Sequence, residues 1–376
     1  MKRPPPPIRK VAHMTSVHAP NDTRIFLKEC RTLASSGYDV HLIAPGTSDA
    51  IHSGVRIWGV RVPRRSNRFT RMTSTVLEVY RRARALAPAI YHFHDPELMP
   101  VALLLAKRGA PVVYDAHEDL VASVPDKVWI RPRLRGPVTR IAERTEPAAA
   151  DRLAAVVAAT PVIEERFAQC KCHVVTVNNY PLLAEFSSVR RFDATKNPAV
   201  CYVGDLTADR GIDTMVEAIA KTDARLLLAG SFKSSHFRDH LEVLAGWSRV
   251  VNFGWVGRTQ VGEIFGRSLA GVVVLRPTVR YICSQPTKLF EYMSAGLPVI
   301  ASGFPLWRKI IESHNCGICV DPLSSDELAE AINWIATHPE EARQMGENGR
   351  GAVRTIYNWE AESRKLIGLY ETILAG

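Results

Sequence analysis

Short apolar runs recur along the chain, separated by longer stretches in which apolar residues return with the period of a helix. The runs are apolar on both faces, which is typical of parallel strands between two layers of helices. They predict strands over residues 11–14, 40–44, 55–60, 89–93, 112–114, 153–159, 200–203, 226–229, 250–253, 271–275, 299–301 and 318–320. Helices are predicted between Asp22 and Gly37 and over residues 74–86, 96–107, 209–220 and 359–374.

The same layout occurs twice, and 376 residues are more than one hydrophobic core usually supports. The sequence therefore predicts an α/β fold of two Rossmann-like, doubly wound domains that face each other across a cleft. The boundaries are residues 1–180, a polar and proline-containing linker over 181–197, and a second domain over 198–356. A last helix within 357–376 packs either on the second domain or back on the first.

Charge and hydropathy narrow the choice of partners and compartment. Lys and Arg number 48 against 38 Asp and Glu, a net charge of +10 that favours anionic partners. The longest apolar run, 98–106, is too short to cross a membrane, and no apolar segment follows Lys2 and Arg3. The seven scattered cysteines suit reduced thiols, and the pair Cys316 and Cys319 leads into a predicted strand, whereas a redox pair normally opens a helix. We therefore expect a cytoplasmic protein.

One segment, residues 285–302, has the residue types of a diphosphate site. Pro286 suits the first turn of a helix, where free N–H groups and the positive end of the helix dipole, together with Lys288, can hold a diphosphate without a metal ion. Glu291 lies nearly one turn further on and can bond ribose hydroxyls. The alternative is that Lys288 and Glu291 form an ion pair on the helix surface.

Further motifs make the chain recognisable. They are the sequences at residues 202–211 (YVGDLTADRG), 251–256 (VNFGWV), 18–29 (HAPNDTRIFLKE), 92–97 (HFHDPE) and 113–118 (VYDAHE). With residues 285–302 they resemble the family 4 glycosyltransferases of the GT-B fold, from about residue 10 to the C-terminus. Each motif alone is weak, but the combination is specific.

The resemblance implies a retaining transfer of a sugar from a UDP- or GDP-sugar to a saccharide or a lipid-linked acceptor, in the synthesis of surface polysaccharide or glycolipid. No metal and no cofactor are expected. Negative charge grows on the leaving diphosphate, so preorganised cations and N–H donors should supply the largest catalytic term.

On the donor side, the resemblance implies that Arg210 clamps the diphosphate. The family usually has an arginine directly after the glycine, whereas Asp205 follows Gly204 here, and Lys288 is expected to compensate. Of two family glutamates eight positions apart, the second matches Glu291 and the first falls at Cys283. The expected donor-binding residues are Gly204, Asp205, Arg210, Trp255, Val256, Ser284, Gln285, Pro286, Thr287, Lys288, Leu289 and Glu291.

In the N-terminal half, His117 occupies the family position that approaches the donor sugar, which makes His117, Arg210 and Lys288 the expected catalytic residues. The expected acceptor-side residues are His18, Asp22, Arg24, His94 and Asp95. A set of potential metal ligands occurs here as well, but the family uses no metal at this place; the set is His92, His94, Asp95, His117 and Glu118. His92 is expected to point into the core.

Residues 61–84 contain eight arginines against one glutamate, Glu78, with apolar residues between them. They predict either a basic amphipathic surface on anionic lipid at the inner face of the plasma membrane, or a solvated face over an ordinary core helix. The arginines expected to contact lipid are Arg64, Arg65, Arg68, Arg71, Arg81 and Arg82.

Two other functions stay open. A sugar-nucleotide epimerase can use the same scaffold, although residues 286–302 favour transfer. A nucleic-acid-binding protein could use the arginines, but few stacking aromatics accompany them, and we expect no nucleic acid.

Overall fold

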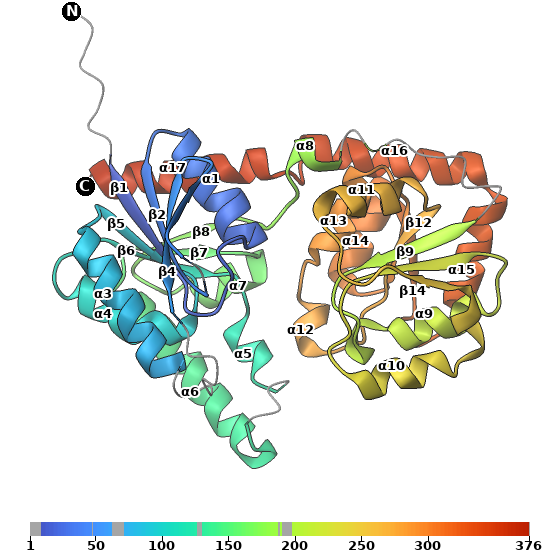
Figure 1. Ribbon diagram of the computed structural model, residues 1–376, viewed down its shortest axis with the longest axis horizontal. Coiled ribbons are helices and arrows are strands. Elements are labelled where there is room, and N and C mark those ends of the chain that lie inside the picture. The colour runs from blue at the N-terminus through green and yellow to red at the C-terminus, as the bar shows by residue number, and fades with distance from the viewer. Residues whose placement is uncertain are drawn as a thin grey trace, which may run out of the picture. The chain divides into compact units, whose positions relative to one another are not determined.

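The computed structural model describes residues 9–46, 48–61, 71–125, 130–186, 189 and 198–375. The chain divides into two compact units, one made of Met1–Asn179 together with Glu360–Gly376, the other of Tyr180–Trp359. Each unit is an α/β domain built around its own sheet (Figure 1). The predicted α/β class, with two Rossmann-like domains that each have their own sheet, is thereby confirmed.

Within the described residues, the N-terminal unit contains an eight-stranded sheet, parallel except for one edge strand. In spatial order its strands are β3 (Ala50–His52), β4 (Val55–Val60), β2 (Asp39–Pro45), β1 (Lys10–Met14), β5 (Ile90–Phe93), β6 (Val112–Ala116), β7 (Ala155–Ala158) and β8 (His173–Thr176). The central strand β1 places Val11 opposite Val40 and Ile90. The antiparallel strand is β3.

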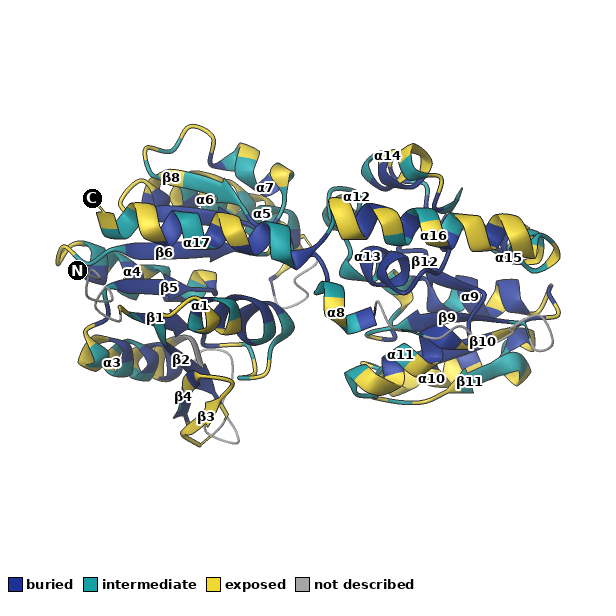
Figure 2. Cartoon of the chain, turned by 90° about the horizontal axis from the view of Figure 1, so that it is seen from above, coloured by how far each residue is buried: buried dark blue, intermediate teal, exposed yellow. Residues whose placement is uncertain are grey.

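The helices of this unit cover both faces of the sheet (Figures 1 and 2). They are η1 (Thr23–Cys30), α1 (Arg31–Ser35), η2 (Arg71–Thr75), α3 (Val76–Leu86), η3 (Pro96–Leu98), α4 (Met99–Ala106), α5 (Leu120–Ser123), α6 (Pro132–Ala150), α7 (Pro161–Arg166) and α17 (Trp359–Ala375). Asp22 caps the first of them by accepting from the N–H groups of Arg24 and Ile25.

The C-terminal unit has a parallel sheet of six strands among the residues described. Their spatial order is β11 (Val250–Asn252), β10 (Arg225–Ala229), β9 (Ala199–Val203), β12 (Ala270–Val273), β13 (Val299–Ser302) and β14 (Gly317–Val320). The helices are α8 (Leu183–Phe186), η4 (Ala208–Arg210), α9 (Ile212–Ile219), α10 (Ser235–Glu242), η5 (Ala245–Arg249), α11 (Arg258–Gly266), α12 (Val279–Ile282), α13 (Thr287–Ser294), α14 (Pro305–His314), α15 (Ser325–Thr337) and α16 (Pro339–Thr355).

Strand β9 shows why its residues must be apolar on both faces. Cys201 packs in the same core cluster as Tyr292 of α13, whereas its neighbour Val200 packs in the cluster that contains Ile212 of α9. Successive side chains of a strand point to opposite faces, so each helix layer has its own core.

The last helix, α17, belongs to the N-terminal unit and lies along it in both views (Figures 1 and 2). Tyr370 is fully buried, the side chain of Glu362 accepts from the backbone N–H of Asn178 at 2.8 Å, and Arg9 donates to the carbonyl of Leu374 at 3.0 Å. Of the two places considered for this helix, the structure has the return to the first domain.

Each predicted strand has a counterpart, but several elements are not predicted. Strand β8 is only half-buried. Helix α6 contains Pro137 and Pro147, and proline usually ends a helix, so the sequence does not predict this one. A short helix, α8, interrupts the predicted linker, whose residues 187–188 and 190–197 lie outside the described residues. No helix in the described ranges is both long enough and apolar enough to cross a membrane.

Candidate functional site

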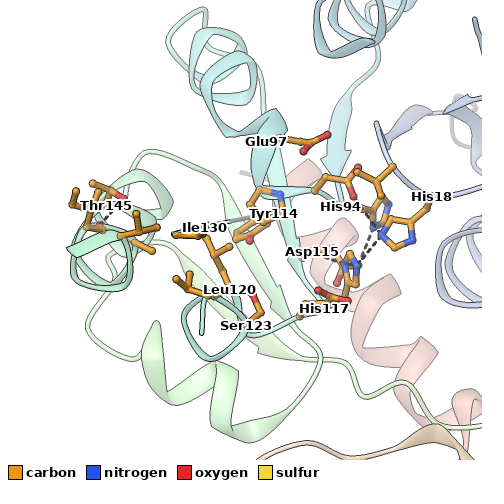
Figure 3. A pocket seen from close by; sticks show the side chains of 18 residues that line it. His18, His94, Glu97, Tyr114, Asp115, His117, Leu120, Ser123, Ile130 and Thr145 are labelled. Carbon is orange, nitrogen blue, oxygen red and sulfur yellow. Dashed lines mark hydrogen bonds and ion pairs between the residues drawn. The ribbon is translucent and has the colours of Figure 1, made fainter. Parts of the chain in front are cut away.

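A cavity of about 520 Å³ lies in the N-terminal unit at the carboxyl ends of β5 and β6 (Figure 3). Its polar part holds His18, His94, Asp95 and His117, and its other part is lined by apolar side chains from α5 and α6. Of the six residues of this half that are predicted for the acceptor side or for catalysis, these four are therefore gathered at one place.

His117 has both ring nitrogens engaged. Its Nε2 lies 3.1 Å from Nε2 of His18, and its Nδ1 lies 3.3 Å from a carboxylate oxygen of Asp115. Asp115 is in the quoted motif at residues 113–118 but is not among the residues predicted for the site. Asp115 lies near the end of β6 and His117 directly follows this strand, so the spacing of two residues is the signal that could have identified Asp115.

His18 sits between two carboxylates, 3.5 Å from Asp22 and 3.3 Å from Asp95. Burial alone would lower the pKa of this imidazole, but its hydrogen bond to Asp22 and the charge of Asp95 raise it. The same hydrogen bond and the helix N–H groups lower the pKa of Asp22 to about 2, against the effect of burial. Asp22 is thus both a helix cap and the partner of a cavity residue.

Asp95 is held by the end of β1. Its carboxylate accepts from the hydroxyl of Thr15 at 2.8 Å and from the backbone N–H of Ser16 at 2.6 Å. These bonds fix the acid at the cavity without a neighbouring lysine or arginine.

The prediction that Arg24 reaches an acceptor or a phosphate is wrong. Its side chain is buried and donates two hydrogen bonds from Nε and Nη2 to Asp115, at 3.0 and 2.7 Å, and one from Nη1 to the carbonyl of Val177. Burial opposes the ionisation of Asp115, but the guanidinium holds the pKa of that carboxyl well below its usual range. Arg24 therefore fixes the charge of Asp115 rather than binding a ligand.

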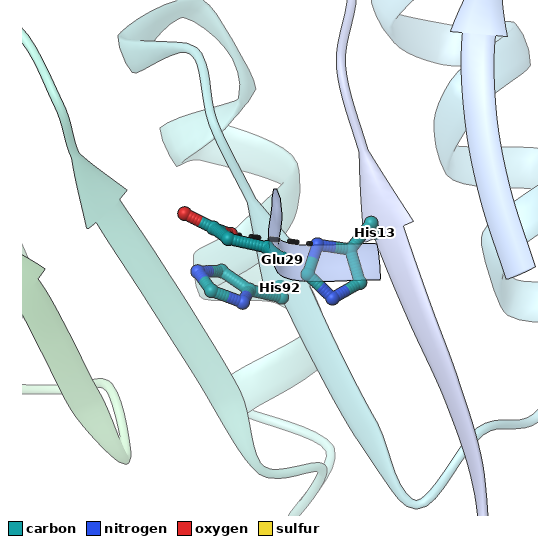
Figure 4. A group of neighbouring side chains, drawn as sticks. All are labelled: His13, Glu29 and His92. Atoms are coloured by element: carbon teal, nitrogen blue, oxygen red, sulfur yellow. Dashed lines mark ion pairs between the residues drawn. The ribbon is translucent and has the colours of Figure 1, made fainter. Parts of the chain in front are cut away.

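Beneath the cavity lies a buried group of polar side chains that the sequence analysis does not predict. His13, Glu29 and His92 are close together (Figure 4), and Tyr370 of α17 lies 2.8 Å from Nδ1 of His92. Burial, together with the nearby charge of Asp115, raises the pKa of Glu29 well above its usual range. His92 points into the core, as expected.

Two sets of atoms in this interior have the spacing of metal ligands: His13, Glu29 and His92, and His92, His94 and Asp115. Hydrogen bonds already join His13 to His94 and His94 to Asp115, at 3.0 and 2.8 Å. The cation beside them is the guanidinium of Arg24. We therefore interpret the group as a hydrogen-bonded network. The metal set considered from the sequence does not form as such, since neither spatial group contains His117 or Glu118.

In the C-terminal unit, neighbouring strands end in glycines with positive φ, +144° at Gly204 after β9 and +146° at Gly230 after β10. A Cβ atom on Gly230 would overlap the carbonyl oxygen of Gly204, and one on Gly204 would overlap the Lys288 side chain. Lys288, near the start of α13, therefore lies directly against the end of β9.

Lys288 and Arg210 are cations without a carboxylate within 4 Å among the described residues. Burial and the nearby charge of Arg210 lower the pKa of Lys288 to about 8. The guanidinium of Arg210 stacks over the ring of Tyr281 at 5.2 Å, and the hydroxyl of Tyr281 donates to Asp209. The two basic residues expected to hold a diphosphate are thus ordered but not neutralised.

Glu291 does not pair with Lys288, so the surface ion pair considered as an alternative is excluded. Its carboxylate accepts from Arg258 at 2.8 Å, and Arg258 also pairs with Glu185 of α8. The sequence analysis does not predict that Arg258 holds Glu291, because the two residues lie far apart in the sequence.

The other predicted donor residues divide into three kinds. Asp205 is exposed and paired with Lys233 at 3.0 Å, and Trp255 is 79% exposed after β11. Leu289 is fully buried in the core, so a ligand role for its side chain is wrong. Ser284, Pro286, Thr287 and Val256 are partly buried, with Pro286 directly before α13 rather than inside its first turn.

The loop before α13 also contains an unsatisfied acceptor. Trp307 donates to the carbonyl of Ser284 at 2.6 Å and anchors the loop. Next to it, the side-chain oxygen of Gln285 is buried with no hydrogen-bond partner in the part of the chain that the structure describes. A buried carbonyl of this kind is costly to leave unpaired, so it is suited to a ligand hydroxyl.

Two protein-family models match the chain. "Glycosyl transferase 4-like domain" matches residues 23–179, and "Glycosyl transferases group 1" matches residues 185–352. Among curated proteins, an alpha-D-kanosaminyltransferase of Streptomyces kanamyceticus is 27% identical over 49% of this chain and 48% of its own, so the chain matches about half the length of that relative. A GDP-mannose-dependent alpha-mannosyltransferase of Mycolicibacterium smegmatis is 27% identical over 94% of this chain and 93% of its own.

Solved structures show the same fold at low identity. A sucrose-phosphate synthase from Thermosynechococcus elongatus superposes with a TM-score of 0.79 at 20% identity, over 98% of this chain and 99% of that chain. The Anabaena protein HepE, solved with UDP and glucose, superposes with a TM-score of 0.71 at 13% identity, over 97% and 100%.

The Arg24–Asp115 pair gives a first prediction. The variant Arg24→Met leaves the Asp115 charge buried without its cation, and we expect the free energy of unfolding to fall by about 3–5 kcal/mol. Urea unfolding of the N-terminal unit measures this. The matched control is Arg31→Met, at an exposed position of α1, for which we expect a change within about 0.5 kcal/mol. Equal stability of the two variants would contradict the assignment.

Proposed function

Because the chain belongs to the family 4 glycosyltransferases, we propose that it transfers a sugar, with retention at the anomeric carbon, from a UDP- or GDP-sugar to a saccharide or lipid-linked acceptor. The observation that carries the proposal is the pair of unneutralised cations, Arg210 and Lys288, at the carboxyl edge of a parallel sheet beside the start of α13. Ligands of doubly wound sheets bind at this edge, and these cations select an anion.

In the proposed reaction the bond between the anomeric carbon and the diphosphate oxygen breaks, and negative charge develops on the leaving diphosphate. Arg210 contacts two phosphate oxygens with its planar fork, while Lys288 and the first N–H groups of α13 meet the remaining charge. We propose that neither a metal ion nor a cofactor takes part, because these fixed groups are placed to supply the positive charge.

Glu291 is proposed to bond the ribose hydroxyls. Its partner Arg258 holds the carboxylate in place from one side, and Arg258 is itself held by Glu185. With Cys283 where the family has its other glutamate, the free acceptor of Gln285 is the group we propose for a donor sugar hydroxyl.

The curated relatives support transfer over epimerisation, since all six are named as glycosyltransferases. One of them, a lipopolysaccharide glucosyltransferase of Escherichia coli, supports a role in the synthesis of surface polysaccharide. None of the six names is that of a nucleic-acid-binding protein.

Nucleotide binding tests the proposal directly. We expect UDP, GDP or one of their sugars, at about 100 times its Kd, to stabilise the protein by about 2.7 kcal/mol and raise the Tm by roughly 5–10 °C. The shift should persist in EDTA and disappear in Arg210→Ala and Glu291→Ala. Arg238→Ala, which removes a surface arginine paired with Glu242, should retain it. No shift in the wild type, or its loss in EDTA, would refute the mechanism.

The pKa of Lys288, about 8, predicts how binding changes with pH. The amine is mostly charged at pH 7 and mostly neutral at pH 9, so its attraction for a diphosphate is lost over this interval. We expect the Kd of the bound nucleotide to rise about tenfold between these pH values, measured by calorimetry. Lys288→Arg, which stays charged, should show a flat profile; the same slope in both proteins would exclude Lys288 as the phosphate contact.

The shape of the N-terminal cavity supports a lipid-linked acceptor. Its apolar part is formed by Leu120, Val124, Ile130, Val138 and Ile141, and Ile141 is 61% exposed although it lines the cavity. An exposed apolar wall next to the imidazoles suits an acceptor with a hydroxyl at one end and an aliphatic chain at the other.

Contact with an anionic membrane at the inner face of the plasma membrane is part of the same proposal. Helix α6, which projects from its unit in Figure 1, and the residue before it expose four arginines with no carboxylate of a described residue within 4 Å: Arg131, Arg133, Arg140 and Arg144. In the basic segment, Arg81 is exposed and Arg82 pairs with Glu78 and Asp49. The remaining residues of that prediction, Arg64, Arg65, Arg68 and the side chain of Arg71, lie outside the described residues.

Alkyl glucosides below their critical micelle concentration test the acceptor. We expect octyl glucoside to bind at least about tenfold more tightly than methyl glucoside, because each buried methylene contributes about 0.8 kcal/mol. Ile141→Ser should weaken octyl glucoside about fivefold and leave methyl glucoside unchanged, by equilibrium dialysis. The control, Leu104→Ser, alters an exposed apolar residue outside the cavity. Equal binding of both glucosides would refute the lipid-linked acceptor. If the protein does not sediment with anionic vesicles at low salt, the membrane contact is refuted.

A further inference from the structure

A continuous row of hydrogen bonds joins the C-terminal helix to the cavity. The hydroxyl of Tyr370 lies 3.2 Å from Nε2 of His13, Nδ1 of His13 lies 3.0 Å from Nε2 of His94, and Nδ1 of His94 lies 2.8 Å from Asp115. All four side chains are fully buried. The row brings together residues from α17, β1, the end of β5 and β6, which are remote from one another in the sequence.

The charge of Asp115 gives this row one direction. Arg24 keeps the carboxylate ionised, so it can only accept, and Nδ1 of His94 must carry a proton. Burial lowers the pKa of His94 and of His13, so each ring is neutral and its other nitrogen accepts. His13 must then donate from Nδ1 to His94 and accept at Nε2 from Tyr370.

A branch of the row agrees with this direction. Because the Tyr370 hydroxyl donates its hydrogen bond to His13, its oxygen accepts from Nδ1 of His92 at 2.8 Å. The remaining nitrogen of His92 is then a bare lone pair, and no described residue pairs with it. In the reversed arrangement that nitrogen would be a buried N–H without an acceptor, and His94 would turn a lone pair toward the carboxylate. Both changes are unfavourable.

We propose that Tyr370 is a positioning residue for the cavity: through His13 and His94 it fixes the orientation of Asp115 and thereby that of His117. Asp115 lies 3.3 Å from Nδ1 of His117. His117 donates from Nδ1 to this carboxylate and turns the lone pair of Nε2 toward Nε2 of His18, 3.1 Å away in the cavity. The effect on sugar transfer rests on the proposed function and on the catalytic role that the resemblance implies for His117; the direction of the hydrogen bonds does not.

The direction can be measured without substrate. In protein labelled with ¹⁵N at histidine, long-range ¹H–¹⁵N spectra distinguish Nδ1–H from Nε2–H rings. We expect Nδ1–H rings for His13, His92 and His94 in the wild type. Tyr370→Phe keeps the buried ring but removes the hydroxyl. His92 loses its hydrogen-bond partner and should become a tautomer mixture, whereas the signals of His13 and His94 should shift while both rings keep Nδ1–H, because Asp115 stays ionised. The control is Tyr38→Phe, whose ring packs 5.7 Å from that of Tyr370 outside the row, and which should leave the spectrum unchanged.

An Nε2–H ring at His94 in the wild type, or a His94 signal unaltered by Tyr370→Phe, would overturn the proposal even if the enzyme transfers sugar.

A second, kinetic experiment uses the nucleotide-sugar that gives the largest thermal shift. We expect Tyr370→Phe to lower kcat about tenfold with the KM for the donor unchanged, and Tyr38→Phe to match the wild type. Wild-type kcat in Tyr370→Phe would refute the positioning role, and lack of donor turnover in the wild type would refute only the proposed function.

Discussion

The N-terminal unit depends on the ionised state of one buried carboxylate. Taking the charge of Asp115 out of water is costly, and Arg24 meets the cost with a two-point contact while its third donor holds the carbonyl of Val177. Because the carboxylate can only accept, it dictates which nitrogen of each neighbouring imidazole bears the proton. The polar end of the cavity is thus ordered from the interior outward, and the side chains exposed to a ligand are oriented by a charge that the ligand does not touch.

In the C-terminal unit the charges at the site are not paired in this way. Arg210 and Lys288 keep positive charge at the sheet edge with no carboxylate of a described residue within 4 Å, and burial together with the charge of Arg210 lowers the pKa of Lys288. Glycines at the ends of β9 and β10 let the backbone and Lys288 come closer than any side chain would allow. An anion that binds here reduces the repulsion between Arg210 and Lys288, and this relief contributes to its binding free energy.

Much of the fold could be predicted from the sequence, because parallel strands need apolar residues on both faces and such apolar runs can be recognised in a single sequence. The predicted site residues that the structure gathers, such as His94, Asp95 and Lys288, follow strands or begin helices. The failures are of two physical kinds. Leu289 is adjacent to Lys288 in sequence, yet the helix turns it into the core. Arg24, Tyr370 and Arg258 owe their roles to partners distant in the sequence, and no local pattern reports a contact made only after folding.

The placement of α17 has a consequence for how the chain is made. The first unit is complete only when residues that follow the second unit in the chain have reached it, since Tyr370 fills its interior and Glu362 bonds to Asn178. During synthesis on the ribosome, the second unit therefore emerges and can fold while the first still lacks an element of its core. Any chaperone that binds the nascent chain must protect an open N-terminal sheet until α17 has been synthesised.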